Sequence, residues 1–518
     1  MNVLARVLRG GPLAAVLLAA ALLPASAQAH WIPTAGGWGL GGGAFGWSAA
    51  SALEEPVEAV ADLPRIGHEP CVKGFAGPFR CHRAQLMSFL PMRDIGGGPS
   101  SIYGGPGNDV WGWTDPQTRK EWVIAGRSDG TSFIDISDPK NPVFVADLPA
   151  AGVTELHSDM KVYENHAFIV KDHRDNGIQV FDLTRLRDID YDDAPVTVDV
   201  DAFYAGISNA HDIAINEETG FAYAVGATRD VEGVPACHGG GLHMVDIREP
   251  QNPTFAGCFD DDGYTHDVQC VIYRGPDERY RGRELCFASN PSSPGVADAL
   301  TIVDVTDHAN PVLVGKVFEG EPNTYSHQGW LTPDQRYFLH DDESDNGSSS
   351  QAIQGRSRNR VFDVKDLENP VLQAVYHGET RAPVHNLYTR GRYMYNANYI
   401  DGLRIVDITK IDHPGGEFAP ETPSAPDHQG LREVACFDTD PYRNDMGEFP
   451  NGRTAWGGSW SNYPYFKSGV VVVSGFDGLF LVKPQLGMTA ASPPGAGKHP
   501  PTGNRGREGR SAACLPTE

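Results

Sequence analysis

Five histidines recur at equivalent places in the chain, each at the start of a short pair of candidate β-strands. The stretch NAHDIAINEETGFAYAVG (209–226) shows the pattern: a His-Asp pair, an apolar run, a turn and a second run. Similar openings occur in ELHSDMKVYENHAFIV, YTHDVQCVIY, YSHQGWLTPDQRYFL and PVHNLYTRGRYMYNA. The five residues are His157, His211, His266, His327 and His385.

Two chemistries suit such a set. Neutral imidazoles that converge on one point are typical ligands of Fe, Cu or Zn, and the same mouth could bind an organic ligand. The alternative is structural: histidine beside Asp, Asn, Ser or Gln commonly hydrogen-bonds within or between repeats. Both interpretations stay open on the sequence alone.

Two acidic segments are separate candidates for a cation site. Carboxylate oxygens on loops suit calcium, although neither segment has the spacing of a calcium-binding helix-loop-helix. The candidates are Asp260, Asp261 and Asp262 in CFDDDGYTHD, and Asp341, Asp342 and Glu343 in HDDESDNGSS. The cofactor is therefore unknown from sequence, with a transition metal or calcium as possibilities.

The histidines belong to a repeated unit. Its signature is an apolar pair, an Asp and an apolar residue, often followed by a turn, with the aspartates at Asp135, Asp182, Asp246, Asp304, Asp363 and Asp407. A seventh copy, GLFLVKPQ (478–485), lacks the Asp. We expect these aspartates to end strands and to accept hydrogen bonds from the turn. Four strands per unit, such as HSDMKVYE, HAFIVKD, IQVFDL and VTVDVDAF, predict an all-β, seven-bladed β-propeller.

Closure of the ring is predicted from the two ends of the repeat region. The last unit has three strands and then a polar tail, whereas AQLMSFLPM (84–92) precedes the first unit without a partner. We expect this N-terminal strand to complete the last blade. Each histidine would start an innermost strand, so the five imidazoles would share one mouth of the channel. The matching positions are near Val110 in the first blade and Trp460–Asn462 in the seventh.

The remaining organisation follows from composition. Residues 1–29 are a predicted signal peptide, with Arg6 and Arg9, an apolar run and a cut after Ala29. We expect a poorly ordered Gly/Ala-rich leader (30–65), a Cys71/Cys81 segment with the closing strand (66–100), the propeller (101–485) and a disordered Pro/Gly-rich tail (486–518).

Eight cysteines in an exported chain favour disulfides, for which 105 connectivities are possible. Short loops favour Cys71–Cys81 and Cys270–Cys286. Cys237–Cys258 is plausible, and Cys436–Cys514 remains.

Charge and motifs exclude several classes. The formal net charge is -25 and no basic patch stands out in the sequence, which argues against nucleic acid and anionic membranes as partners. No later segment reaches transmembrane length, and no nucleophile elbow, zinc-protease or phosphate-loop motif occurs.

Several motifs together resemble the choice-of-anchor B family of LVIVD-repeat proteins. They are CVKGFAGPFRC, QLMSFLPMRDIGG, NDVWGWTDP, GRSDGTSFIDISDPKNPV, GYTHDVQCVIY, SHQGWLTPDQRYFL and WSNYPYF. The resemblance covers roughly residues 66–484 and implies an exported or surface-displayed propeller. It implies no settled activity.

These observations predict a soluble exported protein, periplasmic or extracellular, that acts as a binding or scaffolding module for a protein, peptide or glycan. Exposed aromatic side chains are candidate contacts, with packing between blades as the alternative: Trp111, Trp113, Trp330, Trp456 and Trp460. The alternative function is a metal-dependent enzyme, oxidative or hydrolytic, that uses the histidines as ligands. The oligomeric state is not predicted.

Overall fold

The computed structural model describes a discontinuous set of residues, all within the compact unit formed by residues 47–518. They are residues 60, 63–97, 106–228, 231, 233–234, 237–291, 299–318, 325–344, 357–378, 380, 382–412, 431–442, 457–486 and 514. The expected signal peptide lies outside these residues, as do most of the expected leader and tail. Trp456 also lies outside them.

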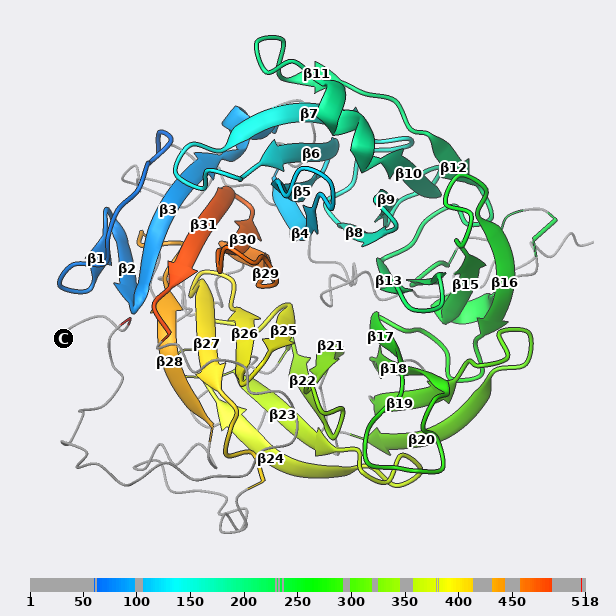
Figure 1. Ribbon diagram of the computed structural model, residues 1–518. Helices are drawn as coiled ribbons and strands as arrows, with labels where there is room; N and C mark the ends of the chain where they lie inside the picture. The colour runs from blue at the N-terminus through cyan, green and yellow to red at the C-terminus, as the bar shows by residue number, and fades with distance from the viewer. Residues whose placement is uncertain are drawn as a thin grey trace, which may run out of the picture. The chain divides into compact units, whose positions relative to one another are not determined.

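The described residues form seven sheets around one axis, here numbered as blades 1 to 7 (Figure 1). The prediction of a seven-bladed β-propeller is confirmed. From the axis outward, blade 1 consists of β4 (Gly107–Thr114), β5 (Glu121–Arg127), β6 (Gly130–Asp135) and β7 (Val143–Pro149). Blade 2 consists of β8 (Ser158–Tyr163), β9 (His166–Lys171), β10 (Ile178–Asp182) and β12 (Ala202–Tyr204). Blade 3 consists of β13 (Asp212–Asn216), β14 (Phe221–Val225), β15 (Leu242–Asp246) and β16 (Thr254–Phe259).

Blades 4 to 7 repeat the arrangement. Blade 4 consists of β17 (Asp267–Ile272), β18 (Glu284–Asn290), β19 (Ala299–Asp304) and β20 (Val312–Phe318), and blade 5 of β21 (Ser326–Leu331), β22 (Tyr337–Asp342), β23 (Arg358–Asp363) and β24 (Val371–His377). Blade 6 consists of β25 (Leu387–Arg390), β26 (Tyr393–Ala397), β27 (Leu403–Asp407) and β28 (Arg432–Phe437). Blade 7 consists of β29 (Ser459–Tyr463), β30 (Val471–Gly475), β31 (Gly478–Pro484) and β3 (Ala84–Pro91).

The ring closes as the sequence predicts. The N-terminal strand β3 pairs antiparallel with β31 and becomes the outer strand of blade 7, so that the blue and red ends of the repeat region lie side by side (Figure 1). Phe89 of β3 is fully buried and packs on Phe79 and Phe480. The innermost strands contact one another in chain order, from β4 through β8, β13, β17, β21 and β25 to β29, which returns to β4.

The repeat aspartates end their strands as predicted. In each of the six copies, one carboxylate oxygen accepts a hydrogen bond from the backbone N–H two residues later. The donors are Ser137, Thr184, Arg248, Thr306, Lys365 and Thr409, at 2.8–3.1 Å. Each Asp therefore satisfies a turn amide at one end of the sheet.

Additional strands or isolated bridges pair with the outer strands of three blades. β11 (Val196–Thr197) pairs parallel with β7, and the hairpin β1 (Phe75–Ala76)–β2 (Phe79–His82) extends blade 6. Isolated bridges from Ile66 and Glu69 lie along β3. The segment VTVDVDAF is thus not one strand, as the sequence suggested: its start joins blade 1 and its end forms β12 of blade 2.

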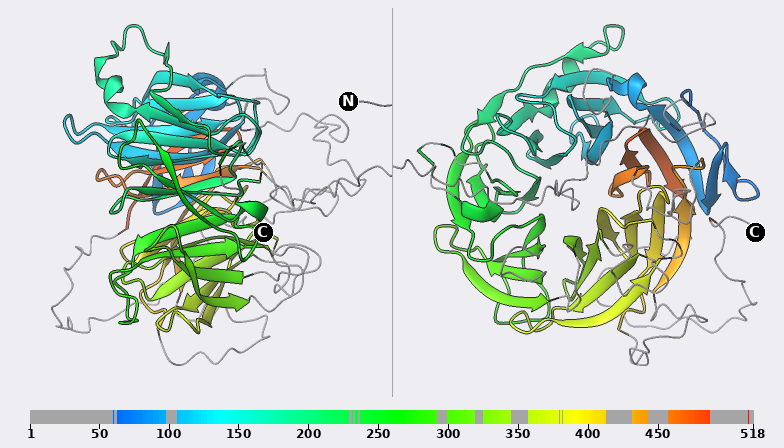
Figure 2. Two further views of the ribbon diagram at one scale, coloured as in Figure 1. Left: turned by 90° about the vertical axis from the view of Figure 1, so that its right-hand side faces the viewer. Right: turned by 180° about the vertical axis from the view of Figure 1, so that it is seen from behind.

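Helical structure among the described residues consists of Val60 and three short 3₁₀ segments, η2 (Met92–Ile95), η3 (Leu183–Asp188) and η4 (His238–Gly240). None of the described helices has the length and apolar character of a membrane span. The side view and the reverse view show the same sheet arrangement (Figure 2).

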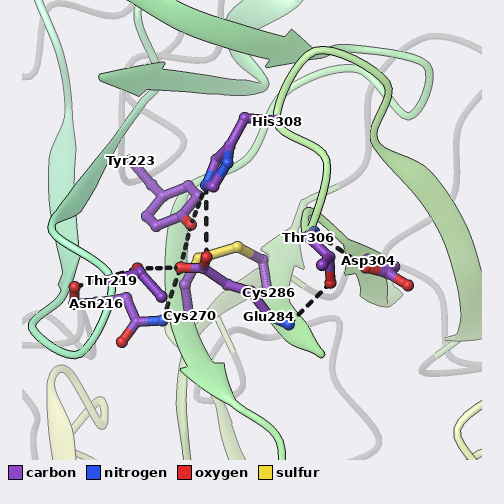
Figure 3. Close-up of a disulfide and its surroundings, with 9 residues drawn as sticks. All are labelled: Asn216, Thr219, Tyr223, Cys270, Glu284, Cys286, Asp304, Thr306 and His308. Atoms are coloured by element: carbon purple, nitrogen blue, oxygen red, sulfur yellow. Dashed lines mark hydrogen bonds and ion pairs between the residues drawn. A yellow bond between two sulfur atoms is a disulfide. The ribbon is translucent and has the colours of Figure 1, made fainter. Parts of the chain in front are cut away.

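All eight cysteines are paired, as Cys71–Cys81, Cys237–Cys258, Cys270–Cys286 and Cys436–Cys514. Figure 3 shows Cys270–Cys286, which joins β17 to β18. Beside it, the buried Glu284 carboxylate accepts hydrogen bonds from the Tyr223 hydroxyl (2.6 Å) and the Asn216 side-chain amide (2.6 Å). Because these donors belong to blade 3 and Glu284 to blade 4, the cluster joins neighbouring blades.

Candidate functional site

The five histidines lie at the starts of inner strands. His157, His211 and His266 immediately precede β8, β13 and β17, His327 is the second residue of β21, and His385 lies two residues before β25. The sheet order therefore places one imidazole from each of five consecutive blades at the same end of the channel.

Their rings form a closed circle with Trp460, the second residue of β29. Neighbouring ring centroids, taken in order from His157 through His211, His266, His327, His385 and Trp460 back to His157, are 5.2, 4.2, 4.4, 4.5, 4.4 and 5.3 Å apart. We call these six side chains the histidine ring. The structure thus brings together all five histidines that the sequence singled out, and blade 7 contributes the indole.

Each Nδ1 atom in the ring faces an oxygen acceptor. His211 pairs with Asp172 (3.0 Å), His327 with Asp341 (2.8 Å) and His157 with Glu155 (3.4 Å). Backbone carbonyl oxygens serve the other two, with His327 O at 3.1 Å from His266 Nδ1 and Trp460 O at 2.6 Å from His385 Nδ1. An acceptor at Nδ1 fixes the proton there and leaves the lone pair on Nε2.

The Nε2 atoms are differently placed. Those of His266 and His327 are buried and have no hydrogen-bond partner among the described residues. His266 and His327 are 4% and 1% exposed. Burial holds the pKa of both imidazoles well below the usual value and lowers the pKa of His385 to about 3. These imidazoles are therefore neutral at pH 7, which is the form that binds metals.

One of the two acidic segments belongs to the same place. Asp341 holds His327, and Glu343 lies 4.0 Å from His327 Nε2 and 3.8 Å from His385 Nε2. The Tyr399 hydroxyl donates a 2.5 Å hydrogen bond to Glu343, whose pKa burial raises to about 7. Asp342, the third residue of the segment, lies 3.6 Å from Arg360. The sequence predicts an independent calcium site at this segment because it does not show that β21 pairs with β22. That pairing brings the segment to the histidine ring.

The other acidic segment lies apart from the ring. Asp262 pairs with Lys316 (2.5 Å) and accepts hydrogen bonds from the side chains of Asn290 and Thr301. Asp260 lies near Cys237 and Cys258, but their sulfur atoms form a disulfide and are not thiolate ligands. Asp261 is exposed. Calcium at this segment stays a prediction.

A layer of carboxylates, of which Asp109, Asp159 and Asp212 are buried and Asp267 is half-buried, lies next to the ring along the channel. A cavity of about 20 Å³, room for one water-sized body, is lined by four of the histidines and Trp460 together with Asp109, Asp159, Asp212 and Asp267. Lys161 Nζ lies 2.6 Å from Asp159 and 3.8 Å from Asp212. Burial raises the pKa of Asp109 to about 7 and that of Asp267 to about 6.

Aromatic side chains adjoin this layer. Lys161 Nζ lies 4.7 Å from the centre of the Trp111 ring, which packs against Tyr388 and Tyr463. Gly112 permits this packing, since a Cβ there would lie 2.2 Å from Tyr463 Cε1. The expected contact residues Trp111 and Trp330 therefore pack on other aromatic rings, Trp330 on Tyr388. Trp113 is 5% exposed and lies in the core.

Sequence reasoning missed the carboxylates that support the histidines. Glu155 lies two residues before His157 in the connection between β7 and β8, whereas Asp172 follows β9 and is brought to His211 by the fold. A signal for the acidic layer was present, since His211 and His266 are each followed directly by Asp.

The comparisons with known proteins concern the repeat and the fold. Residues 295–318, which include β19 and β20, match the family model of the LVIVD repeat, so the prediction of that repeat is confirmed for this segment. No curated protein matched the sequence. Among solved structures, the hydrazine synthase of Kuenenia stuttgartiensis is 13% identical with a TM-score of 0.41, over 68% of this chain and 88% of that chain. The WD40 repeats of RRP9 are 7% identical with a TM-score of 0.43, over 76% and 97%.

Proposed function

We propose that this protein is a metalloprotein that acts outside the cytoplasm and holds a transition metal in the histidine ring. The observation that carries the proposal is the difference between the surroundings of Nδ1 and those of Nε2 in the imidazoles. Every Nδ1 has an oxygen acceptor, whereas Nε2 of His266 and His327 is buried without a hydrogen-bond partner among the described residues. Metal-binding histidines have this arrangement, in which the second nitrogen is held by a carboxylate or carbonyl.

A purely structural role explains the hydrogen bonds of Nδ1 but not the surroundings of Nε2. Hydrogen bonds from Nδ1 to Asp172 and Asp341 tie strands together, and they explain a repeated histidine. They do not explain buried Nε2 atoms without a partner, each of which costs about 1–3 kcal/mol. A metal ion bound to Nε2 would offset that cost.

The donor set indicates the class of metal and chemistry. Imidazole nitrogen with carboxylate oxygen suits Fe, Cu, Zn or Mn. Such an ion supplies Lewis-acid or redox chemistry, which corresponds to a hydrolytic or an oxidative enzyme. The disulfides and the expected signal peptide support a periplasmic or extracellular location. Membership of the choice-of-anchor B family is part of the proposal, and the LVIVD-repeat match supports it.

Cobalt binding tests the proposal. Protein stripped of metal should take up Co²⁺ at a stoichiometry of about one per chain, with visible absorption bands of nitrogen-ligated cobalt. The His327→Ala/His385→Ala variant should lose these bands, while His243→Gln, which changes a buried histidine outside the ring, should retain them. Absence of Co²⁺ uptake by folded wild-type protein would contradict the proposal.

A binding or scaffolding module for an extracytoplasmic protein, peptide or glycan is the second candidate. It is favoured by apolar side chains on the outer strands of two neighbouring blades: Val312 and Phe318 on β20 and Val371 on β24 are 60%, 55% and 52% exposed. Substitution of these three residues by Ser should then weaken partner capture and leave Co²⁺ uptake unchanged. Equal capture by the variant would exclude this surface.

A further inference from the structure

Glu343 is a buried carboxylate that forms no ion pair with an arginine or lysine among the residues that the structure describes. It lies just beyond the end of β22, and the residue is 4% exposed. Its nearest titratable neighbours are the imidazoles of His327 and His385 and the Tyr399 phenol. Burial of a charged carboxylate is costly unless a cation or several hydrogen bonds compensate it. The Tyr399 hydroxyl supplies one hydrogen bond, whereas the two imidazole Nε2 atoms lie beyond hydrogen-bond range of the carboxylate.

The distances fit a bridging ion better than hydrogen bonds. The Glu343 oxygens lie 3.8 Å from His385 Nε2 and 4.0 Å from His327 Nε2, beyond hydrogen-bond range. Two ligand atoms that are each about 2.1 Å from one ion lie at most about 4.2 Å apart. Both separations fall inside that limit, the first measured to Oε1 and the second to Oε2. One ligand atom from each of the three residues lies within 4.8 Å of the other two, so binding of a single ion requires a small contraction of the set. Movements of roughly half an ångström would give the angles of a tetrahedral or octahedral ion.

Each of these three groups makes a further hydrogen bond that fixes its orientation. His327 Nδ1 is held by Asp341 and His385 Nδ1 by the Trp460 carbonyl. The Tyr399 hydroxyl donates to Glu343 Oε1 at 2.5 Å, and Tyr399 itself is 2% exposed. One carboxylate oxygen is thus occupied by the phenol, and the side chain has little freedom to turn away from the imidazoles.

We propose that Glu343 is the anionic ligand of the metal in the histidine ring and selects the metal, with Tyr399 as its positioning residue. The inference rests on the proposed function and deepens it. Two histidines and one carboxylate leave further coordination positions open, a pattern typical of non-haem Fe²⁺ sites. A hard carboxylate oxygen favours Fe²⁺ and Mn²⁺ relative to an all-imidazole set, which suits copper. The open positions would take water or a small oxygen-donor substrate.

Metal selectivity of Glu343 variants tests this assignment. Stripped wild-type protein, Glu343→Gln and Glu343→Asp would be titrated anaerobically with Mn²⁺, followed by the electron paramagnetic resonance of the free ion, and with Cu²⁺. We expect Glu343→Gln to weaken Mn²⁺ binding at least about tenfold and Cu²⁺ binding less than about threefold. Glu343→Asp keeps the negative charge and should bind Mn²⁺ more tightly than Glu343→Gln does.

Two controls make the result interpretable. Tyr399→Phe should weaken Mn²⁺ binding by about tenfold while the carboxylate remains. Glu121→Gln changes a buried carboxylate elsewhere, which accepts a backbone hydrogen bond from Ser468, and should change neither affinity. Wild-type Mn²⁺ affinity in Glu343→Gln, or equal affinities in the Gln and Asp variants, would overturn the inference while the histidine-bound metal stands. Failure of wild-type protein to bind any of the ions would instead remove the proposed function.

Discussion

At the scale of single residues, the partner of Nε2 separates the ring histidines from an ordinary core histidine. His243 is 2% exposed, and its Nε2 lies 2.8 Å from the Tyr204 hydroxyl. His327 is equally buried, but its Nε2 has no hydrogen-bond partner among the described residues. Both imidazoles are neutral because burial lowers their pKa. Burial alone therefore does not mark a ligand, and neither does a vacant nitrogen, since Nε2 of His166 also lacks a hydrogen-bond partner among the described residues. The vacant nitrogen of His327 is informative because a second imidazole and the Glu343 carboxylate lie beside it.

The pH dependence of stability reports on His243. Burial lowers its pKa from 6.5 to about 4, so the unfolded chain binds the proton more readily. Its contribution to stability is therefore complete above pH 6.5 and falls by up to about 3 kcal/mol as the pH drops to 4. His243→Gln should show a shallower loss of unfolding free energy over that range in urea titrations. Tyr204→Phe, which leaves His243 buried, should keep the wild-type slope; an unchanged slope in His243→Gln would contradict this account.

The identity of the five histidines could be predicted from sequence because each opens the same repeated unit. Their supporting acids could not. Glu155 and Asp172 have no repeated counterpart, and Asp341 was taken for part of a calcium loop. Such contacts depend on which strand ends meet at the channel mouth, and that is a property of the closed ring.

At the scale of elements, β3 determines whether the ring closes. Its pairing with β31 spans Ala84 to Pro91, and Phe89 packs against Phe79 and Phe480. This closure was predictable because the seventh unit lacks an outer strand and β3 lacks a local partner. The division of VTVDVDAF between two blades was not predictable, since both halves have the alternation of a strand.

Truncation of a buried side chain in the closing strand β3 should lower the stability of the protein. Phe89→Ala should lower the free energy of unfolding by about 3–5 kcal/mol, because a fully buried aromatic ring is removed and a cavity remains. Phe75→Ala provides the matched control, since Phe75 in β1 is 50% exposed and should change stability by less than about 0.5 kcal/mol. Denaturant unfolding with equal m-values measures both. Equal losses would mean that the packing of β3 does not stabilise the ring.

At the scale of the whole molecule, the fold gathers one side chain from each of six blades into the histidine ring, with a carboxylate layer beside it. Inner strands that contact one another in chain order make this arrangement possible. Asp109, Asp159 and Asp212 are buried along the channel with Lys161, and the half-buried Asp267 lines the same cavity. Because burial raises the pKa of Asp109 to about 7 and that of Asp267 to about 6, a cation bound at the mouth would favour the ionised form of these carboxylates.

The most direct measurement is elemental analysis of the protein, purified without chelator or a histidine tag, beside His327→Ala/His385→Ala and His243→Gln. The account predicts about one transition-metal ion per chain in wild type and His243→Gln, and its loss from the double variant. Less than about a tenth of an ion per chain in folded wild-type protein, or equal metal in the double variant, would contradict the metal centre and leave the ring histidines as structural residues.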